Sequence, residues 1–248
     1  MNVVVASSRG FDIQEHLPEG TISESKAGGK LIKTLTPLAK SLTPYANQHY
    51  KRPHIYFVCG IPDITELIKS PENSPYHYRE VIFVEEPSIC IKRYQNDLET
   101  CQREILRHGA LPIFATIPQY SIEIYNNHIL TCKHPKTSHL HHNLDYKTMQ
   151  TNMVETIDSI NGIISRMNKT VGASTPFLHH TVKEYRGKKG SRYYVYRYDR
   201  YRDGLHAGEN LAKKWADSLG NAFVLNQRRD ISEDEGSPKR SWKKCRKF

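Results

Sequence analysis

The sequence predicts an α/β fold of three layers, in which helices cover both faces of a central, mostly parallel sheet of five strands. Two observations predict this class. Short apolar runs alternate along the chain with longer segments of helical periodicity, which is the pattern of βαβ units. The apolar runs are also continuous rather than interrupted by polar residues, as in strands that are covered on both faces. The sequence therefore indicates an α/β/α sandwich.

The strands of this sheet are predicted from apolar runs near the start and middle of the chain. Residues 2–6 read NVVVA and end at a turn of small polar residues, and we expect this strand near the middle of the sheet. Residues 53–60 end in glycine, and residues 111–117 end before a proline. The side chains expected to be largely buried are Val3, Val4, Val5, Ile55, Phe57, Ile113 and Phe114.

Helices are predicted where apolar residues recur three and four positions apart. These segments are residues 29–42, 88–108, 146–168 and 207–219. A glycine follows the second and the fourth segment and suits a helix end, so the last helix is expected to stop before Gly220. Residues 126–143, which are polar and His-rich, fit the pattern less well. Residues 187–201 also fit this pattern poorly. Two interpretations stay open for them, a hairpin and a long active-site loop.

The length and charge of the chain predict one domain with a tail. The 248 residues suit one large domain, which we place at residues 1–227. Residues 228–248 are charged and poor in apolar side chains, so a basic, disordered tail is predicted there. The formal net charge is +10, and much of it lies in residues 183–202 and 238–248. This Lys/Arg-rich C-terminal region suits a solvated surface, a nuclear-import signal, or contact with nucleic acid or another polyanion.

The sequence also bears on the compartment of the protein. No stretch approaches the roughly 20 apolar residues of a membrane span. The first residues turn polar at Ser7 and lack a basic leader. The five cysteines are widely spaced and form no CxxC pair, which favours reduced thiols. We therefore expect a soluble, intracellular protein, cytoplasmic or nuclear, without a membrane span.

Chemistry is expected at the carboxyl ends of the strands, because ligands bind there in open α/β sheets. Residues 7–9 follow the first predicted strand, and residues 60–63 follow the second. Two further candidate segments are turns that precede predicted helices, at residues 28–29 and 203–206. All four segments can therefore meet at one edge of the sheet.

Three side chains at this edge suit nucleophilic catalysis. Asp203 and His206 are three residues apart at the start of a predicted helix, so both can face the same way. A carboxylate there can hold an imidazole in one tautomer, and the imidazole can then deprotonate a serine such as Ser8. Each residue also has a plainer interpretation, Asp203 as a helix cap and Ser8 as the N-cap of a turn.

Taken together, these blocks resemble those of the SGNH (GDSL-type) hydrolases. Ala6-Ser7-Ser8 is similar to the family's first block, usually Gly-Asp-Ser. Ala27-Gly28-Gly29-Lys30-Leu31 is similar to its second block, a Gly followed by small or polar residues and a helix. Gly60-Ile61-Pro62-Asp63 is similar to the third block, Gly-x-Asn-Asp, and Asp203-Gly204-Leu205-His206 to the last, Asp-x-x-His. The blocks and their flanking elements span residues 3–219, and the basic tail would suit a source in a virus or mobile genetic element.

The resemblance implies a fold, a site and an activity. The fold would be the family's flavodoxin-like sandwich, and Ser8, His206 and Asp203 would be the catalytic triad. The oxyanion would be held at Ser8, Gly28 and Gly60. The chain would hydrolyse small acyl esters, as an esterase or a deacetylase, and would need no metal or organic cofactor.

The third block departs from the family at Pro62, which replaces the Asn whose side-chain amide donates to the oxyanion. Proline has neither a side-chain donor nor a backbone N–H. Losing one such donor typically costs about 10²–10³ in turnover. Thr65 would substitute if the loop bends. The alternative to a hydrolase is therefore a weakly active or inactive SGNH-like module that binds nucleic acid or protein.

Two further groups of residues stay open at this point. The first contains Cys132, His134, His139, His141 and His142. Their spacing matches no standard zinc finger, so no metal site is assigned. The second is residues 193–201, YYVYRYDRY. Its interleaved aromatic and Arg side chains suit either stacking on single-stranded bases or a strand with one tyrosine face packed.

Overall fold

A parallel sheet lies at the centre of the protein. The computed structural model describes residues 2–47, 52–70, 79–83, 85–133, 145–188, 191 and 193–234. Within these residues, four strands form one sheet in the order β2-β1-β3-β6, and each neighbouring pair is parallel. The strands are β1 (Asn2–Ala6), β2 (Ile22–Ser25), β3 (His54–Val58) and β6 (Leu111–Phe114). The predicted α/β class and the inner position of the first strand are confirmed.

The inner strands are buried on both faces, which explains why their apolar runs do not alternate with polar residues. All seven side chains that the sequence predicted to be buried are at most 1% exposed. The rings of Phe57 and Phe114 stack between neighbouring strands, with centroids 5.3 Å apart. The core therefore extends across β1, β3 and β6.

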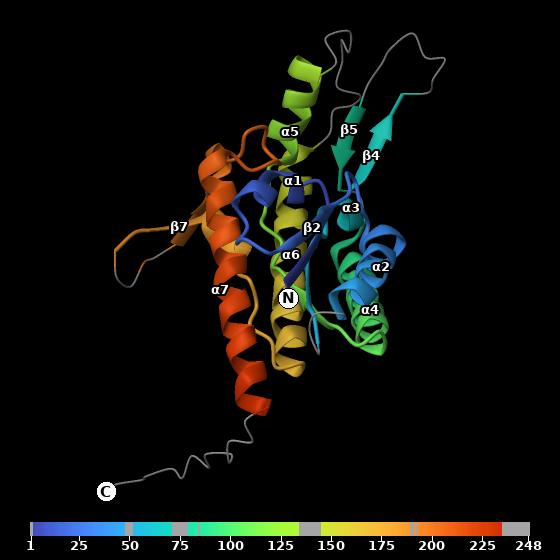
Figure 1. Cartoon of the computed structure of the whole chain (residues 1–248). Helices are drawn as coiled ribbons and strands as arrows, with labels where there is room; N and C mark the ends of the chain where they lie inside the picture. The colour runs from blue at the N-terminus through green and yellow to red at the C-terminus, as the bar shows by residue number, and fades with distance from the viewer. Residues whose placement is uncertain are drawn as a thin grey trace, which may run out of the picture.

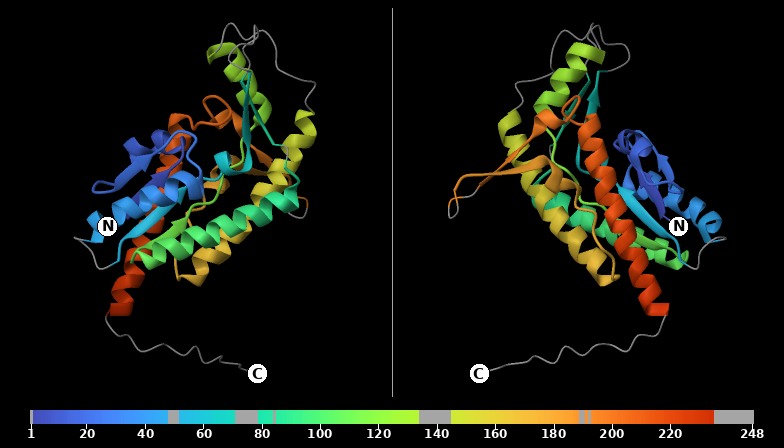
Figure 2. Two further views of the ribbon diagram at one scale, coloured as in Figure 1. Left: turned by 90° about the vertical axis from the view of Figure 1, so that its right-hand side faces the viewer. Right: turned by 60° about the vertical axis from the view of Figure 1, so that its left-hand side comes forward.

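Helices cover both faces of the sheet, as Figures 1 and 2 show. α2 (Thr36–Asn47) and α4 (Pro87–Arg107) lie on one side, and α7 (Glu209–Asp234) lies on the other. On the α7 side, the ring of Tyr56 packs against Phe223 with centroids 4.5 Å apart. α6 (Tyr146–Thr170) packs against α4 and β6. The three-layer prediction is thus confirmed.

Shorter elements connect these layers and surround the carboxyl edge of the sheet. Two antiparallel hairpins are added to the sandwich, β4 (Glu66–Lys69) with β5 (Arg79–Ile82), and β7 (Lys183–Arg186) with β8 (Tyr193–Tyr196). Within the segment 187–201, for which a hairpin or a loop was open, residues 193–196 form the second strand of the hairpin of β7 and β8. The remaining helical segments are α1 (Gly10–Ile13), α3 (Ile61–Ile64), α5 (Ile122–His128), the π-helical turns Leu31–Leu35 and Ile129–Lys133, and the 3-10 turns Gln14–His16, Leu178–Val182 and Tyr198–Arg200.

The prediction of five strands was wrong by one, because other groups take the hydrogen bonds along the free edge of β6. The side chain of Asn168 accepts from the N–H of Phe114 (3.0 Å) and donates to its carbonyl (2.7 Å). Beyond the strand, the N–H of Thr116 donates to the carbonyl of Pro176 (3.0 Å). Proline has no N–H to return to a neighbouring strand. A fifth ladder therefore does not form in the described part of the chain.

The prediction that the last helix ends before Gly220 was also wrong, because α7 continues to Asp234. Beyond the glycine, Ala222 and Phe223 are buried and Asn226 donates to the hydroxyl of Tyr56 (3.0 Å). These tertiary contacts outweigh the roughly 1 kcal/mol that a glycine costs inside a helix. The helix passes the expected domain boundary at residue 227, and residues 235–248 lie outside the described residues.

Candidate active site

The serine that follows β1 lies on a short, sterically fixed turn. The N–H of Ser7 donates to the carbonyl of Val58 (3.0 Å), and the N–H of Gly10 donates to the carbonyl of Ser7 (2.9 Å). A Cβ atom at Gly10 would lie 2.1 Å from Ser25 Oγ, so only glycine fits where α1 begins. The turn therefore holds Ser8 at the carboxyl end of the central strand, partly exposed.

Asp203 and His206 form a second fixed turn, before α7. Asp203 Oδ1 accepts from the N–H groups of Leu205 (3.0 Å) and His206 (2.6 Å). Asp203 Oδ2 lies 2.7 Å from His206 Nδ1. Gly204 has a φ of 87°, and a Cβ there would lie 2.8 Å from the N of Tyr125. One carboxylate thus orders both the backbone of the turn and the imidazole.

The charge on Asp203 follows from these contacts. Burial by itself raises the pKa of the carboxyl group. Hydrogen bonds from the His206 side chain and from the backbone N–H groups of His206 and Leu205 outweigh burial, and the pKa lies well below its ordinary value. An ionised carboxylate only accepts hydrogen bonds, so Nδ1 of His206 carries the proton. Nε2 is then the imidazole nitrogen that can accept one.

A cleft of about 800 Å³ joins the two turns. It is lined by Ser7, Ser8, Arg9, Phe11, Asp12, Ala27, Gly28, Lys30, Ile61, Pro62, Thr65, Glu66, Leu67, Val81, Tyr125, Arg202, Leu205 and His206. Among the predicted site residues, Ser8, Gly28 and His206 thus line the same space. Asp203 is 4% exposed and does not line the cleft, but it contacts the imidazole of His206, which does.

Gly60, which was expected to help hold the oxyanion, is not among the residues that line the cleft. It is buried below α3 with a φ of 120°, and a Cβ there would lie 2.3 Å from Ile117 Cδ1. Its carbonyl accepts from the N–H groups of Asp63 and Ile64, both at 3.1 Å. Gly60 therefore shapes the turn that presents Ile61 and Pro62 to the cleft.

The third and second sequence blocks are connected by Asp63. Its Oδ1 accepts from the N–H of Leu31 (2.9 Å), the first residue of the π-helical turn that leads into α2. Thr65 lines the cleft, but its hydroxyl donates to the carbonyl of Ile61 (2.7 Å). Its single proton is therefore engaged, and the side chain does not replace the missing Asn donor.

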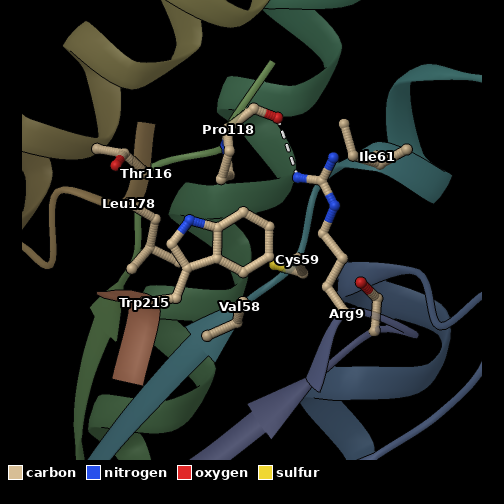
Figure 3. Close-up of a pocket in the computed structure, with 9 residues that line it drawn as sticks. Arg9, Val58, Cys59, Ile61, Thr116, Pro118, Leu178 and Trp215 are labelled. Atoms are coloured by element: carbon tan, nitrogen blue, oxygen red, sulfur yellow. Dashed lines mark hydrogen bonds between the residues drawn. The ribbon is translucent and has the colours of Figure 1, made fainter. Parts of the chain in front are cut away.

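Arg9 is a residue of the site region that the sequence analysis left without a role. It is 4% exposed, and its Nη1 donates to the carbonyl of Pro118 (2.9 Å), as Figure 3 shows. The guanidinium lies over three rings, those of Tyr120 (5.8 Å), Tyr201 (5.7 Å) and Trp215 (5.5 Å). Burial lowers the pKa of Arg9. Arg9, which follows Ser8, therefore packs against rings that precede and follow the Asp203–His206 turn in the sequence.

Asp12 is a second residue whose position the sequence did not indicate. Its Oδ2 accepts from the N–H of Ala207 (3.1 Å), and its Oδ1 lies 3.5 Å from Arg202 Nη2. Burial raises the pKa of Asp12, and the neighbouring His206 opposes that shift. In the sequence, only its position four residues after Ser8 relates Asp12 to the site. In the structure, Asp12 connects the helix that follows Ser8 to the turn that contains His206.

Among the described residues, no group of three or more His, Cys, Asp or Glu side chains is placed so that it could hold a metal ion. The His-rich candidates His134, His139, His141 and His142 lie outside the described residues, as does the side chain of Cys132. No helix in the described part of the chain is long and apolar enough to cross a membrane.

Comparisons with known proteins were made by sequence and by structure. No protein-family model matches the sequence, and no curated protein matches it. Among solved structures, a protein assigned as an acylhydrolase from Bacteroides fragilis is 11% identical, with a TM-score of 0.51 over 93% of this chain and 87% of that one. A GDSL-like lipase from Bacteroides thetaiotaomicron is 9% identical, with a TM-score of 0.52 over 92% and 88%.

At these identities the likeness establishes the fold. The two solved structures are covered over most of their length, so the match includes the whole sandwich rather than one motif. The sheet order, the inner first strand and the flanking helices agree with the fold that the sequence blocks implied. The chain therefore shares its α/β/α fold with these two proteins, and this is the fold that the resemblance to the SGNH hydrolases implied.

Proposed function

We propose that the protein is a serine-dependent hydrolase of small acyl esters, acting as an esterase or a deacetylase. The observation that carries this proposal is the cleft that Ser8 and His206 line together, with Asp203 bonded to Nδ1 of the imidazole. The fold supports the same reaction class, because it is shared with proteins assigned as an acylhydrolase and a lipase.

In the proposed reaction, Ser8 Oγ attacks the carbonyl carbon of the ester. His206 accepts the hydroxyl proton at Nε2 and delivers it to the leaving alkoxide, which departs as the alcohol. A water molecule then attacks the acyl-enzyme by the same route and releases the acid. Asp203 stays ionised throughout, because its lowered pKa keeps it an acceptor for the Nδ1 proton.

The negative charge of the tetrahedral intermediate needs donors on the cleft wall. We assign this role to the backbone N–H groups of Ser8 and Gly28, for which no protein acceptor lies among the described residues. Pro62 lines the same wall and offers no donor. Turnover is therefore expected to be slow compared with an enzyme that has an Asn at this position.

The proposal is tested with short p-nitrophenyl esters and with a serine-reactive fluorophosphonate probe. Wild type should hydrolyse the esters and take up the probe at one site. Ser8→Ala should lose the label and fall to the background rate, and His206→Ala should cost about as much, because triad members act as a unit. Ser159→Ala, at an exposed position on α6, is the matched control and should keep both properties.

A second pair of variants tests the incomplete oxyanion site. Pro62→Asn should raise kcat about tenfold or more with little change in KM, because the donor acts on the transition state. Pro62→Ala removes the proline without adding a donor and should not reproduce the gain. If wild type hydrolyses no ester and takes up no probe, the hydrolase proposal fails, and the alternative of a noncatalytic SGNH-like module replaces it.

A further inference from the structure

The hairpin of β7 and β8, here called the tyrosine ribbon, extends away from the sandwich. In Figure 1 and in the right-hand view of Figure 2, its strands lead outward from α6 and α7. The two strands are antiparallel, and the register pairs Tyr185 with Tyr194 and Arg186 with Tyr193. The ribbon takes no part in the cleft described above.

Large aromatic side chains are exposed on both faces of the tyrosine ribbon. Tyr185 is 70% exposed, Tyr193 58% and Tyr194 44%. Because side chains alternate along a strand, Tyr185 and Tyr194 share one face and Tyr193 lies on the other. The rest of the chain therefore covers these three rings only in part, and least of all Tyr185.

The base of the tyrosine ribbon is anchored, which holds the exposed rings in place. The hydroxyl of Tyr196 donates to Asp158 of α6 (3.1 Å), and Lys183 Nζ lies 3.1 Å from the same carboxylate. The Lys183 ammonium lies over the ring of Tyr194, 4.6 Å from its centroid. Tyr185 and Tyr194 meet edge to face, with centroids 6.1 Å apart. The outer rings are thus presented on a fixed support.

The charge of this region is strongly positive. Residues 183–202 contain eight Lys or Arg and two acidic side chains, Glu184 and Asp199. Both acidic side chains form ion pairs with Arg197, and Glu184 also pairs with Arg186 (3.3 Å). Arg186 and Lys188, toward the outer end of β7, are exposed. The tyrosine ribbon therefore combines exposed aromatic side chains with an excess of cations.

We propose that the tyrosine ribbon binds single-stranded nucleic acid. Bases stack on Tyr185 and Tyr194, and the exposed side chains of Arg186 and Lys188 supply positive charge that attracts the phosphates. Single strands fit better than duplexes because their bases have free faces for aromatic rings, and stacking of this kind does not depend on sequence. A purely electrostatic surface for any polyanion would have no use for three exposed tyrosines.

The test measures binding of a fluorescein-labelled oligothymidylate of about 15 nucleotides to the full-length protein by fluorescence anisotropy. Tyr185→Ala and Tyr194→Ala should each weaken binding by about 5- to 150-fold, which is the range for loss of one base–aromatic stack. Tyr185→Phe keeps the ring and should bind like wild type. Tyr45→Ala, which removes a 54% exposed tyrosine from α2, is the matched control.

A salt series separates stacking from charge. Arg186→Gln should lower the slope of log Kd against log salt by about one, whereas Tyr185→Ala should leave the slope unchanged. The basic C-terminal residues are present in every variant, so their contribution cancels. Melting temperatures equal to that of wild type would show that each variant is folded.

Three results would overturn the proposal. The first is an affinity of Tyr185→Ala equal to that of wild type. The second is a duplex of the same length that binds as tightly as the single strand, because paired bases hide their faces. The third is self-association of the protein that Tyr185→Ala abolishes, which would assign the tyrosine ribbon to contact with a second copy of the chain.

Discussion

Two buried aspartates, Asp203 and Asp63, have opposite electrostatic environments. Asp203 accepts from two backbone N–H groups and the His206 ring, and its pKa lies below the ordinary value. Asp63 accepts from one N–H, that of Leu31, and its Oδ2 has no partner in the described structure. Burial raises the pKa of Asp63 to about 7. The number of donors, rather than burial alone, decides which carboxylate stays ionised.

The raised pKa of Asp63 predicts that the free energy of unfolding depends on pH. Between about pH 4, where Asp ionises in the unfolded chain, and pH 7, only the folded state keeps the proton, so the free energy of unfolding falls as pH rises. The fall is about 1.4 kcal/mol per pH unit, or roughly 4 kcal/mol across the window. Asp63→Asn keeps an oxygen for Leu31 and should be more stable than wild type at pH 8.

Urea denaturation of both proteins from pH 4 to pH 8 checks this prediction. The difference in unfolding free energy should grow with pH and level off above about pH 7. Asp217→Asn, at an exposed position on α7, should show no such growth. A constant difference between wild type and Asp63→Asn at every pH would mean that Asp63 is ionised in the folded protein throughout this range.

Site residues that belong to a recognisable motif could be predicted from the sequence. Residues that reach the site only through tertiary packing could not. Ser8, Gly28 and His206 could be selected because their types and spacing match a known pattern, and they line one cleft. Their catalytic roles stay predictions. Arg9 could not be selected, because an arginine is almost always exposed, and the rings that enclose it come from residues more than 100 positions away.

At the scale of elements, asparagine side chains pair with the outer backbone groups of two strands, β6 and β5, and of the segment that follows β6. Asn168 and Asn161 of α6 each pair with both backbone groups of one residue, Phe114 and Ile117. Asn126 of α5 does the same for Val81 of β5, at 2.8 Å for both bonds. Each amide offers one acceptor and one donor and so replaces a neighbouring strand. These buried asparagines attach helices to strand edges.

Removal of one such amide should be costly. Asn168→Ala leaves the N–H and the carbonyl of Phe114 buried without a partner, and each unsatisfied group costs about 1–3 kcal/mol. We expect a loss of about 2–5 kcal/mol in unfolding free energy, measured by urea denaturation. Ser159→Ala, on the exposed face of the same helix, should change stability by less than about 0.5 kcal/mol. Equal effects of the two substitutions would contradict the role of the amide.

The elements that the sequence predicted correctly are those with continuous apolar runs or long helical periodicity. β1 has the predicted bounds, and α4 and α6 differ from prediction by a few residues. The hairpin of β4 and β5 was missed, since Glu66, Leu67 and Lys69 are exposed and show no buried face. Strand β2, which forms one edge of the central sheet, was missed because its four residues, ISES, include only one apolar side chain. Its pairing depends on β1, not on its own pattern.

At the scale of the whole molecule, the C-terminal part of α7 contacts β3 and the segment that follows α6. Asp230 Oδ2 lies 2.9 Å from Nε2 of His54, which is 2% exposed at the start of β3. Arg229 donates to the carbonyl of Gly172, and Asn226 to the hydroxyl of Tyr56. The expected boundary at residue 227 thus divides a helix that remains in contact with the sheet. Composition alone did not indicate this, because residues 228–234 are mostly polar and charged.

Two truncations locate the end of the folded unit. Removal of residues 228–248 deletes the contacts of Arg229 and Asp230, and we expect a loss of about 1–2 kcal/mol. For a chain of this size that corresponds to a melting temperature lower by about 2–8 °C. Removal of residues 235–248 keeps these contacts, and the melting temperature should stay within about 1 °C of wild type. Asp230→Asn in the full chain should reproduce part of the first effect, because it weakens the contact with His54. Equal melting temperatures for the two truncated proteins would support the boundary at residue 227 that the charge pattern predicted.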